Sequence, residues 1–158
     1  MTLLNTPRTS PAERLAKRFA LLRERYGFAV LDAGSFAAYA DMPGTSLIMF
    51  AEDPAKVPET WDLTIVLPEL VGASVALGAL RVGILPPELA HPLAARYGLR
   101  VWPALVALRN GAYLGAIEGL KDWGVYSRLI PELLAAEPSR PPGIGIPVMN
   151  ANAGTACH

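Results

Sequence analysis

The residues best placed to do chemistry are four carboxylates around a tryptophan in the middle of the chain. Glu52 and Asp53 follow an apolar run, and Glu59, Trp61 and Asp62 come shortly after them. Paired carboxylates can serve as general acid and base, or they can bind the basic groups of a partner. Because the sequence offers no nucleophile, cofactor motif or metal-ligand cluster beside them, we interpret them as binding residues.

The chain has one cysteine and two histidines, so it offers few residues for thiol or imidazole chemistry. The single cysteine, Cys157, is next to the last residue, so an internal disulfide, a Cys-x-x-Cys motif and a zinc cluster are impossible. His91 is the only interior histidine and has no second ligand beside it. Cys157 and His158 could bind a soft metal or become oxidised, but chain ends are commonly disordered. We expect no catalytic residue, no metal and no cofactor.

Charge is balanced over the whole chain but not along it. Lysine plus arginine equals aspartate plus glutamate at 14 each, so the basic surplus of a polyanion-binding protein is missing. Nucleic acid is therefore not an expected partner. Residues 32–69 carry seven acidic side chains and one lysine. This acidic segment is either a solvated face or a patch that attracts a basic partner.

Targeting signals are not apparent in the sequence. No apolar core follows the charged residues of segment 1–27, so a signal peptide is not predicted. The most apolar stretch, residues 63–80, is broken by proline, glutamate and glycine, which argues against insertion into a membrane. With one cysteine and no export signal, we expect a cytoplasmic protein.

Helix and strand signals alternate in the first half of the chain and predict the elements that position the carboxylates. Ser10, Pro11 and Glu13 form a helix start, and Gly27 ends that helix. The pattern then predicts a strand at 28–32, a short helix at 35–40 and an apolar central strand at 45–51. Thr60 is expected to cap a helix at 61–73 that is kinked near Pro68.

The second half predicts two further helices and a closing hairpin. We expect a strand at 75–82, a helix between Pro86 and Gly98, and a strand at 99–109 interrupted by proline. Asn110 and Gly111 form a strong hairpin signal, followed by a strand at 113–118 and a helix from Asp122 to about residue 136. Parallel units followed by a hairpin imply an α/β fold in which a central mixed sheet is flanked by helices.

The length and composition favour one folded domain with a tail. The chain has 158 residues, of which 52% are hydrophobic, and this suits a single core. We assign residues 1–137 to the domain and residues 138–158, rich in proline and glycine, to an extended flexible tail. The strip at 141–148 either adds a strand to a partner's sheet or folds back on the body.

This order of elements and several local strings resemble the thioredoxin fold. Residues 96–105 (RYGLRVWPAL) look like the segment with the cis-proline of that fold, so we predict a cis peptide between Trp102 and Pro103. The redox motif would fall on residues 60–63, which read Thr-Trp-Asp-Leu and contain no cysteine. Since disulfide exchange requires an attacking thiolate, the resemblance implies the fold without its usual chemistry.

A more specific resemblance is to the hydrogenase expression proteins of the HyaE/HupG/HoxO type. It rests on residues 102–105 (WPAL), 115–126 (GAIEGLKDWGVY) and 141–148 (PPGIGIPV). The resemblance implies a cofactor-free chaperone in the maturation of uptake [NiFe] hydrogenases, which is not an enzyme. Its partner would be the small-subunit precursor with its twin-arginine signal peptide, bound before export by the Tat route, and a second maturation chaperone is a further expected partner.

We hypothesise that a groove near the thioredoxin-type site binds this peptide. The groove would lie between the loop at 59–62 and the loop at 102–103, with aromatic platforms beside carboxylates. The candidate peptide-binding residues are Glu52, Asp53, Glu59, Trp61, Asp62, Trp102 and Pro103. Two alternatives stay open: a divergent thiol oxidoreductase that uses Cys157, and a structural accessory subunit of a hydrogenase assembly complex.

Overall fold

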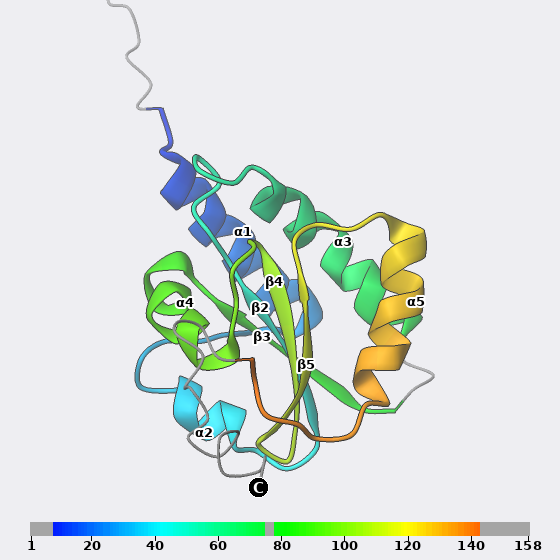
Figure 1. Ribbon diagram of the computed structural model, residues 1–158. Coiled ribbons are helices and arrows are strands. Elements are labelled where there is room, and N and C mark those ends of the chain that lie inside the picture. Colours follow the sequence, from blue (N-terminus) through cyan, green and yellow to red (C-terminus); the bar gives the residue numbers. More distant parts are fainter. Residues whose placement is uncertain (1–7, 75–77, 143–158) are drawn as a thin grey trace, which may run out of the picture.

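The computed structural model describes residues 8–74 and 78–142, which form a five-stranded mixed sheet with helices on both faces (Figure 1). The helices are α1 (Pro11–Tyr26), α2 (Phe36–Ala40), α3 (Glu59–Ala73), α4 (Pro87–Ala94) and α5 (Trp123–Leu134), and a 3₁₀ turn, η2 (Ala95–Tyr97), follows α4. The strands are β1 (Ala29–Val30), β2 (Thr45–Phe50), β3 (Leu80–Leu85), β4 (Ala104–Arg109) and β5 (Ala112–Glu118). Their order in the sheet is β1-β3-β2-β4-β5.

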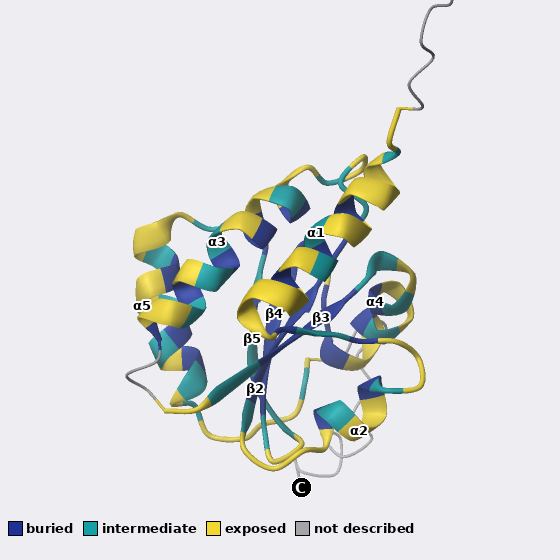
Figure 2. Cartoon of the chain, turned by 180° about the vertical axis from the view of Figure 1, so that it is seen from behind, coloured by how far each residue is buried: buried dark blue, intermediate teal, exposed yellow. Residues whose placement is uncertain are grey.

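Strand β2 is the centre of the sheet. It pairs in parallel with β3 on one side and antiparallel with β4 on the other, and β5 closes the sheet as an antiparallel edge. Leu47 and Met49 pack into a core with α1, α3 and α5, whereas Ile48 and Phe50 pack into a second core with α2 and α4. This alternation follows from the two-residue period of a strand. Figure 2 shows the buried strands between helices whose outer sides are exposed.

The mixed sheet and its flanking helices confirm the predicted fold class, and the Trp102–Pro103 peptide bond is cis as predicted. Two strand boundaries were predicted wrongly. The strand expected at 75–82 occupies Leu80–Leu85, after Gly78 with its positive φ of 111°. The strand expected from residue 99 begins at Ala104, because the N–H groups of Arg100 and Val101 donate to the side chain of Glu118.

The start of α3 also differs from the prediction. The helix begins at Glu59 after Pro58, and Thr60 lies inside it with a buried hydroxyl that has no hydrogen-bond partner among the described residues. Thr60 therefore does not cap the helix. The predicted cap failed because a threonine hydroxyl next to an apolar run fits either a helix end or the core, and only packing decides between them.

Pro68 interrupts the hydrogen bonds of α3, and Arg18 of α1 compensates. A proline has no N–H to donate, so the carbonyl four residues earlier, that of Thr64, loses its helical partner. The Nη2 of Arg18 donates to this carbonyl at 3.0 Å, and its Nε lies 3.4 Å from the Thr64 hydroxyl. The proline thus links α3 to α1 through a side chain that no local pattern would single out.

The segment after α5 crosses the sheet. The Ser139 N–H donates to the Tyr113 carbonyl of β5 at 2.8 Å, and Pro142 lies against Gly98, which adopts a left-handed backbone with φ of 68°. In Figure 1 this stretch runs from the end of α5 across to the side of α4. Ser139 and Pro142, which belong to the expected tail, therefore contact the body. The strip at 143–148, Cys157 and His158 lie outside the described residues.

We predict that Arg18→Met lowers the free energy of unfolding by about 1.5 kcal/mol, because the Thr64 carbonyl loses a charged donor in a partly buried place. Urea denaturation gives the measurement. In a Pro68→Ala background the loss should shrink, since an alanine N–H restores the helical donor. The exposed neighbour Lys17→Met is the control, and an equal loss in both backgrounds would contradict this account.

Candidate functional site

The site lies where the sheet divides its helices between two faces. Strands β2 and β3 are parallel neighbours, yet the chain passes from β2 to α3 on one face and from β3 to α4 on the other. Such a switch point opens a crevice at the carboxyl ends of the strands, and α/β proteins bind ligands there. The loops that follow β2 and β3 carry Glu52 and Pro86, and both residues line a cavity at this place.

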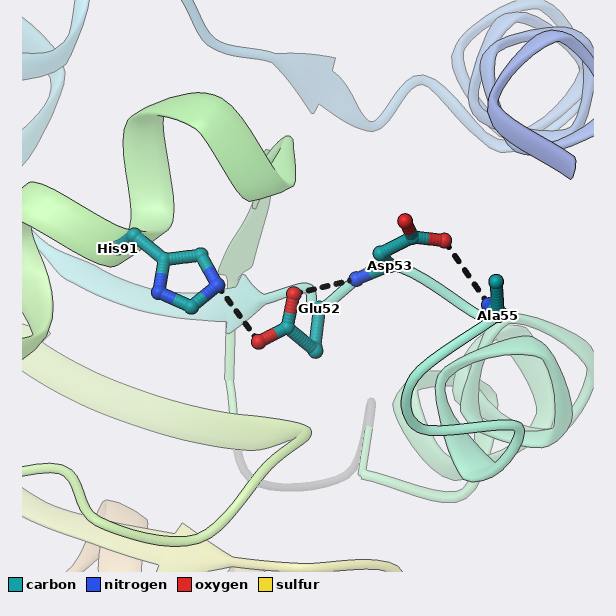
Figure 3. A network of polar contacts seen from close by, with 4 residues as sticks. All are labelled: Glu52, Asp53, Ala55 and His91. Carbon is teal, nitrogen blue, oxygen red and sulfur yellow. Dashed lines mark hydrogen bonds and ion pairs between the residues drawn. The ribbon is translucent and has the colours of Figure 1, made fainter.

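Glu52 is a buried carboxylate at the end of β2, with 5% of the residue exposed. Its Oε2 accepts a hydrogen bond from His91 Nε2 at 2.6 Å, and its Oε1 accepts one from the Asp53 N–H at 2.7 Å (Figure 3). The His91 side chain is 49% exposed, so the two partners differ strongly in their contact with water. The carboxylate is held inside while the imidazole covers it from the solvent side.

Asp53 shapes the loop rather than facing Glu52. Its Oδ1 accepts the Ala55 N–H at 2.9 Å (Figure 3), and its carbonyl accepts the N–H groups of Lys56 and Val57. Asp side chains commonly stabilise turns in this way. The turn directs the chain from the end of β2 toward α3, and it fixes the position of Glu52 beside α4.

Opposing effects set the pKa of Glu52. Burial is the largest and raises the pKa, whereas the hydrogen bonds from His91 and the Asp53 N–H, with the charges of His91 and Lys56, lower it. Together the lowering effects outweigh burial, so the pKa lies below the ordinary value of 4.5. The carboxylate is therefore ionised at neutral pH and is a built-in anion of the site.

Trp102 and Trp61 pack on different cores. The Trp102 ring lies 4.9 Å from the His91 ring and belongs to the core of α2 and α4, and Pro103 after it is buried. Trp61 belongs to the core of α1 and α3, and the Arg14 guanidinium lies 5.4 Å from its ring centre. The structure thus groups Trp102 with Glu52 through His91, and Trp61 with α1.

Two adjacent cavities share Pro54. The larger, of about 640 Å³, lies between α1 and the loops after β2 and β3, and the smaller, of about 330 Å³, contains Trp61 and Asp62. Glu52 and Asp53 line the larger one. Glu59 is exposed in the first turn of α3 and lines neither. Of the seven candidate residues, Glu52 and Asp53 thus line the larger cavity and Trp61 and Asp62 line the smaller one, whereas Glu59, Trp102 and Pro103 line neither.

Sequence reasoning missed the α1 wall and His91. Leu15 and Phe19 are buried residues of α1, and they line the larger cavity as well. His91 lies 39 positions after Glu52, and the sequence contains no signal that joins them. Only the crossover from β3 into α4 brings the imidazole to the end of β2.

Within residues 8–74 and 78–142, no three histidine, cysteine or acidic side chains gather to hold a metal ion. Within the same described ranges, no helix has the length and apolar character that crossing a membrane requires.

The strand order, the cis-proline before β4 and the helices on both faces define a thioredoxin-like domain, in which residues 60–63 carry no cysteine. A thioredoxin variant from Halobacterium salinarum matches the structure with a TM-score of 0.53 and 21% identity, over 70% of this chain and 93% of that protein. At this identity the match shows the fold alone.

Sequence comparison shows the family. The family model described as Hydrogenase-1 expression protein HyaE matches residues 18–126. Hydrogenase expression/formation protein HoxO from Cupriavidus necator is 38% identical over the whole of this chain and 96% of its own length. Hydrogenase expression/formation protein HupG from Bradyrhizobium diazoefficiens is 35% identical over 70% of this chain and 76% of its own length. The chain belongs to the HyaE family of hydrogenase expression proteins, as the sequence resemblance implied.

The lowered pKa of Glu52 predicts a pH dependence of stability. The stabilising contribution of the carboxylate is fully present above the unfolded pKa near 4.5 and is lost as the pH falls through the lower folded value. Glu52→Gln should therefore be less stable than wild type at pH 7, and the two should converge toward pH 3. Chemical denaturation across this range tests it, with the exposed Glu59→Gln as control. A gap that stays constant with pH would exclude the explanation.

Proposed function

We propose that this protein is a non-redox chaperone in [NiFe] hydrogenase maturation, which binds the small-subunit precursor and its twin-arginine signal peptide in the cytoplasm before Tat export. The observation that carries the proposal is the family match, in which the relatives are named hydrogenase expression/formation proteins. The thioredoxin-like body supports it, because the place of the redox cysteines holds Thr60, Trp61, Asp62 and Leu63.

The surface around Trp61 has the chemistry that such a peptide needs. A twin-arginine signal presents guanidinium groups followed by an apolar run, and carboxylates bind guanidinium groups in charge-assisted pairs. Asp62 and Glu59 are exposed in the first turn of α3, and the half-buried Trp61 lies beside Asp62. An aromatic residue with a few charged neighbours commonly dominates a binding interface.

The proposed mechanism is protection rather than catalysis. Covering the signal and the neighbouring surface of the precursor prevents export until the metal clusters are in place and the subunits have paired. Release must follow, so we expect moderate affinity, with a Kd on the order of micromolar. A second maturation chaperone could take over the precursor at that stage.

Charge reversal at the front of α3 tests the peptide site. We expect Glu59→Lys with Asp62→Lys to weaken binding of the signal peptide about tenfold at low salt, because attraction to the arginines becomes repulsion. Fluorescence anisotropy with the labelled peptide gives the Kd. The control is Glu24→Lys with Glu137→Lys, which changes the net charge equally at exposed positions outside both cavities. Unchanged affinity in the α3 variant would remove Glu59 and Asp62 from the site.

The thiol oxidoreductase alternative has its own test. Cys157 supplies the only thiol of the chain, so Cys157→Ala removes any possible thiolate. We expect neither the wild type nor the variant to accelerate the reduction of insulin disulfides by dithiothreitol. We also expect the two proteins to bind the signal peptide with equal affinity. If the wild type accelerated insulin reduction and Cys157→Ala did not, the protein would be a thiol oxidoreductase instead.

A further inference from the structure

The larger cavity combines an apolar wall with a buried anion. One wall is α1, with the buried Leu15 and Phe19 and three alanines, and Pro86 and Pro87 line the cavity from the start of α4. Glu52 opens into the same cavity from the end of β2. A purely apolar pocket would suit many side chains, but an ionised carboxylate in it favours a ligand that is part apolar and part cationic.

Glu52 is held by a partner that can be exchanged. Among the described residues, its carboxylate accepts one hydrogen bond on each oxygen, whereas an ionised carboxylate has about four acceptor positions. The Asp53 N–H is part of the backbone and keeps its hydrogen bond to Glu52. His91, in contrast, is a half-exposed side chain that lines the larger cavity. His91 is half-exposed and can turn toward solvent if it gives up its hydrogen bond to Glu52 and its contact with Trp102, whereas Glu52, with 5% exposure, cannot follow it. A replacement cation must therefore come to the carboxylate.

The carboxylates that line the larger cavity outnumber its arginine and lysine side chains. Glu88 on α4 and Asp53 add two further carboxylates, while Arg23 and Lys56 also line the cavity. In the smaller cavity, by contrast, the chain's own Arg14 already lies over Trp61. The Trp61 side therefore has a guanidinium of this chain close to it, whereas the side chain that hydrogen-bonds to Glu52 is the imidazole of His91, and the charge of Lys56 acts on the same carboxylate.

We propose that the larger cavity is the arginine subsite of the chaperone: a guanidinium of the bound peptide replaces His91 on Glu52, and the apolar residue after it packs on α1. This inference rests on the proposed function and names the place where one arginine binds. The guanidinium can pair with Glu52 through two hydrogen bonds, whereas His91 Nε2 supplies one. The two cavities adjoin at Pro54, which lines both of them, so the same peptide can extend from the larger cavity toward Trp61 and Asp62.

Two variants with different expected effects test the exchange. The probe is a synthetic peptide with two adjacent arginines and an apolar run, and its affinity is measured by calorimetry. Glu52→Gln should weaken binding at least about tenfold, because the buried anion is lost. His91→Ala should leave binding equal or tighter, because the peptide no longer displaces a competitor. If the pair had only a structural role, both variants would weaken binding together.

A cavity-filling variant tests the apolar part without touching the ion pair. Ala16 is exposed on α1 and lines the cavity, so Ala16→Trp should occupy it and weaken binding while the fold is kept. Ala38→Trp, at an exposed position of α2 on the other face, is the matched control and should bind like wild type. Thermal unfolding of each variant confirms that it is folded.

The outcomes separate this inference from the proposed function. If the wild type binds the peptide, and Glu52→Gln and Ala16→Trp bind it equally well, the arginine subsite is wrong while the chaperone function stands. If the wild type does not bind the peptide, both fail. A peptide in which glutamine replaces both arginines should bind wild type and Glu52→Gln alike. Discrimination between these two proteins by the glutamine peptide would overturn the role of the guanidinium.

Discussion

The double burial of β2 is the constraint on which the remaining structure depends. Leu47, Ile48, Met49 and Phe50 are fully buried, and each contributes about 1.5–3 kcal/mol of hydrophobic free energy. Since successive side chains point to opposite faces, the strand must have helices on both sides. The chain meets this requirement by sending α3 to one face and α4 to the other, and the crevice at the end of β2 results from that division.

The candidate site lies at this crevice, and residues 60–63 beside it contain no cysteine for the thiol chemistry of redox thioredoxins. Where a redox thioredoxin has cysteines, this chain has Thr60-Trp61-Asp62-Leu63. The buried polar side chain of the candidate site is Glu52, in the loop directly after β2. The buried carboxylate of Glu52 is hydrogen-bonded to the half-exposed imidazole of His91, and this imidazole packs against the indole ring of Trp102. In the function that we propose, recognition by this scaffold depends on charge and apolar contact.

Three prolines, Pro54, Pro68 and Pro103, lie beside the contacts that shape the helices and the candidate site. Pro68 leaves a carbonyl that Arg18 satisfies, and Pro54 lies between the two cavities. Pro103 is buried directly before β4, next to the tryptophan that supports His91. Local sequence rules placed the helices well, but the start of β4, which directly follows Pro103, depends on the contacts of Arg100 and Val101 with Glu118 and was misplaced.

The sequence by itself determined the fold class, the apolar central strand, the caps of α1 and the absence of a redox cysteine pair, because these depend on local patterns or on composition. It also identified the acidic residues around Trp61. The tertiary structure alone decided that Glu52 is buried against His91, that Trp61 and Trp102 belong to different cores, and that α1 forms the wall of the larger cavity. Those contacts join residues far apart in the chain, and only the crossover of helices to opposite faces of the sheet brings them together.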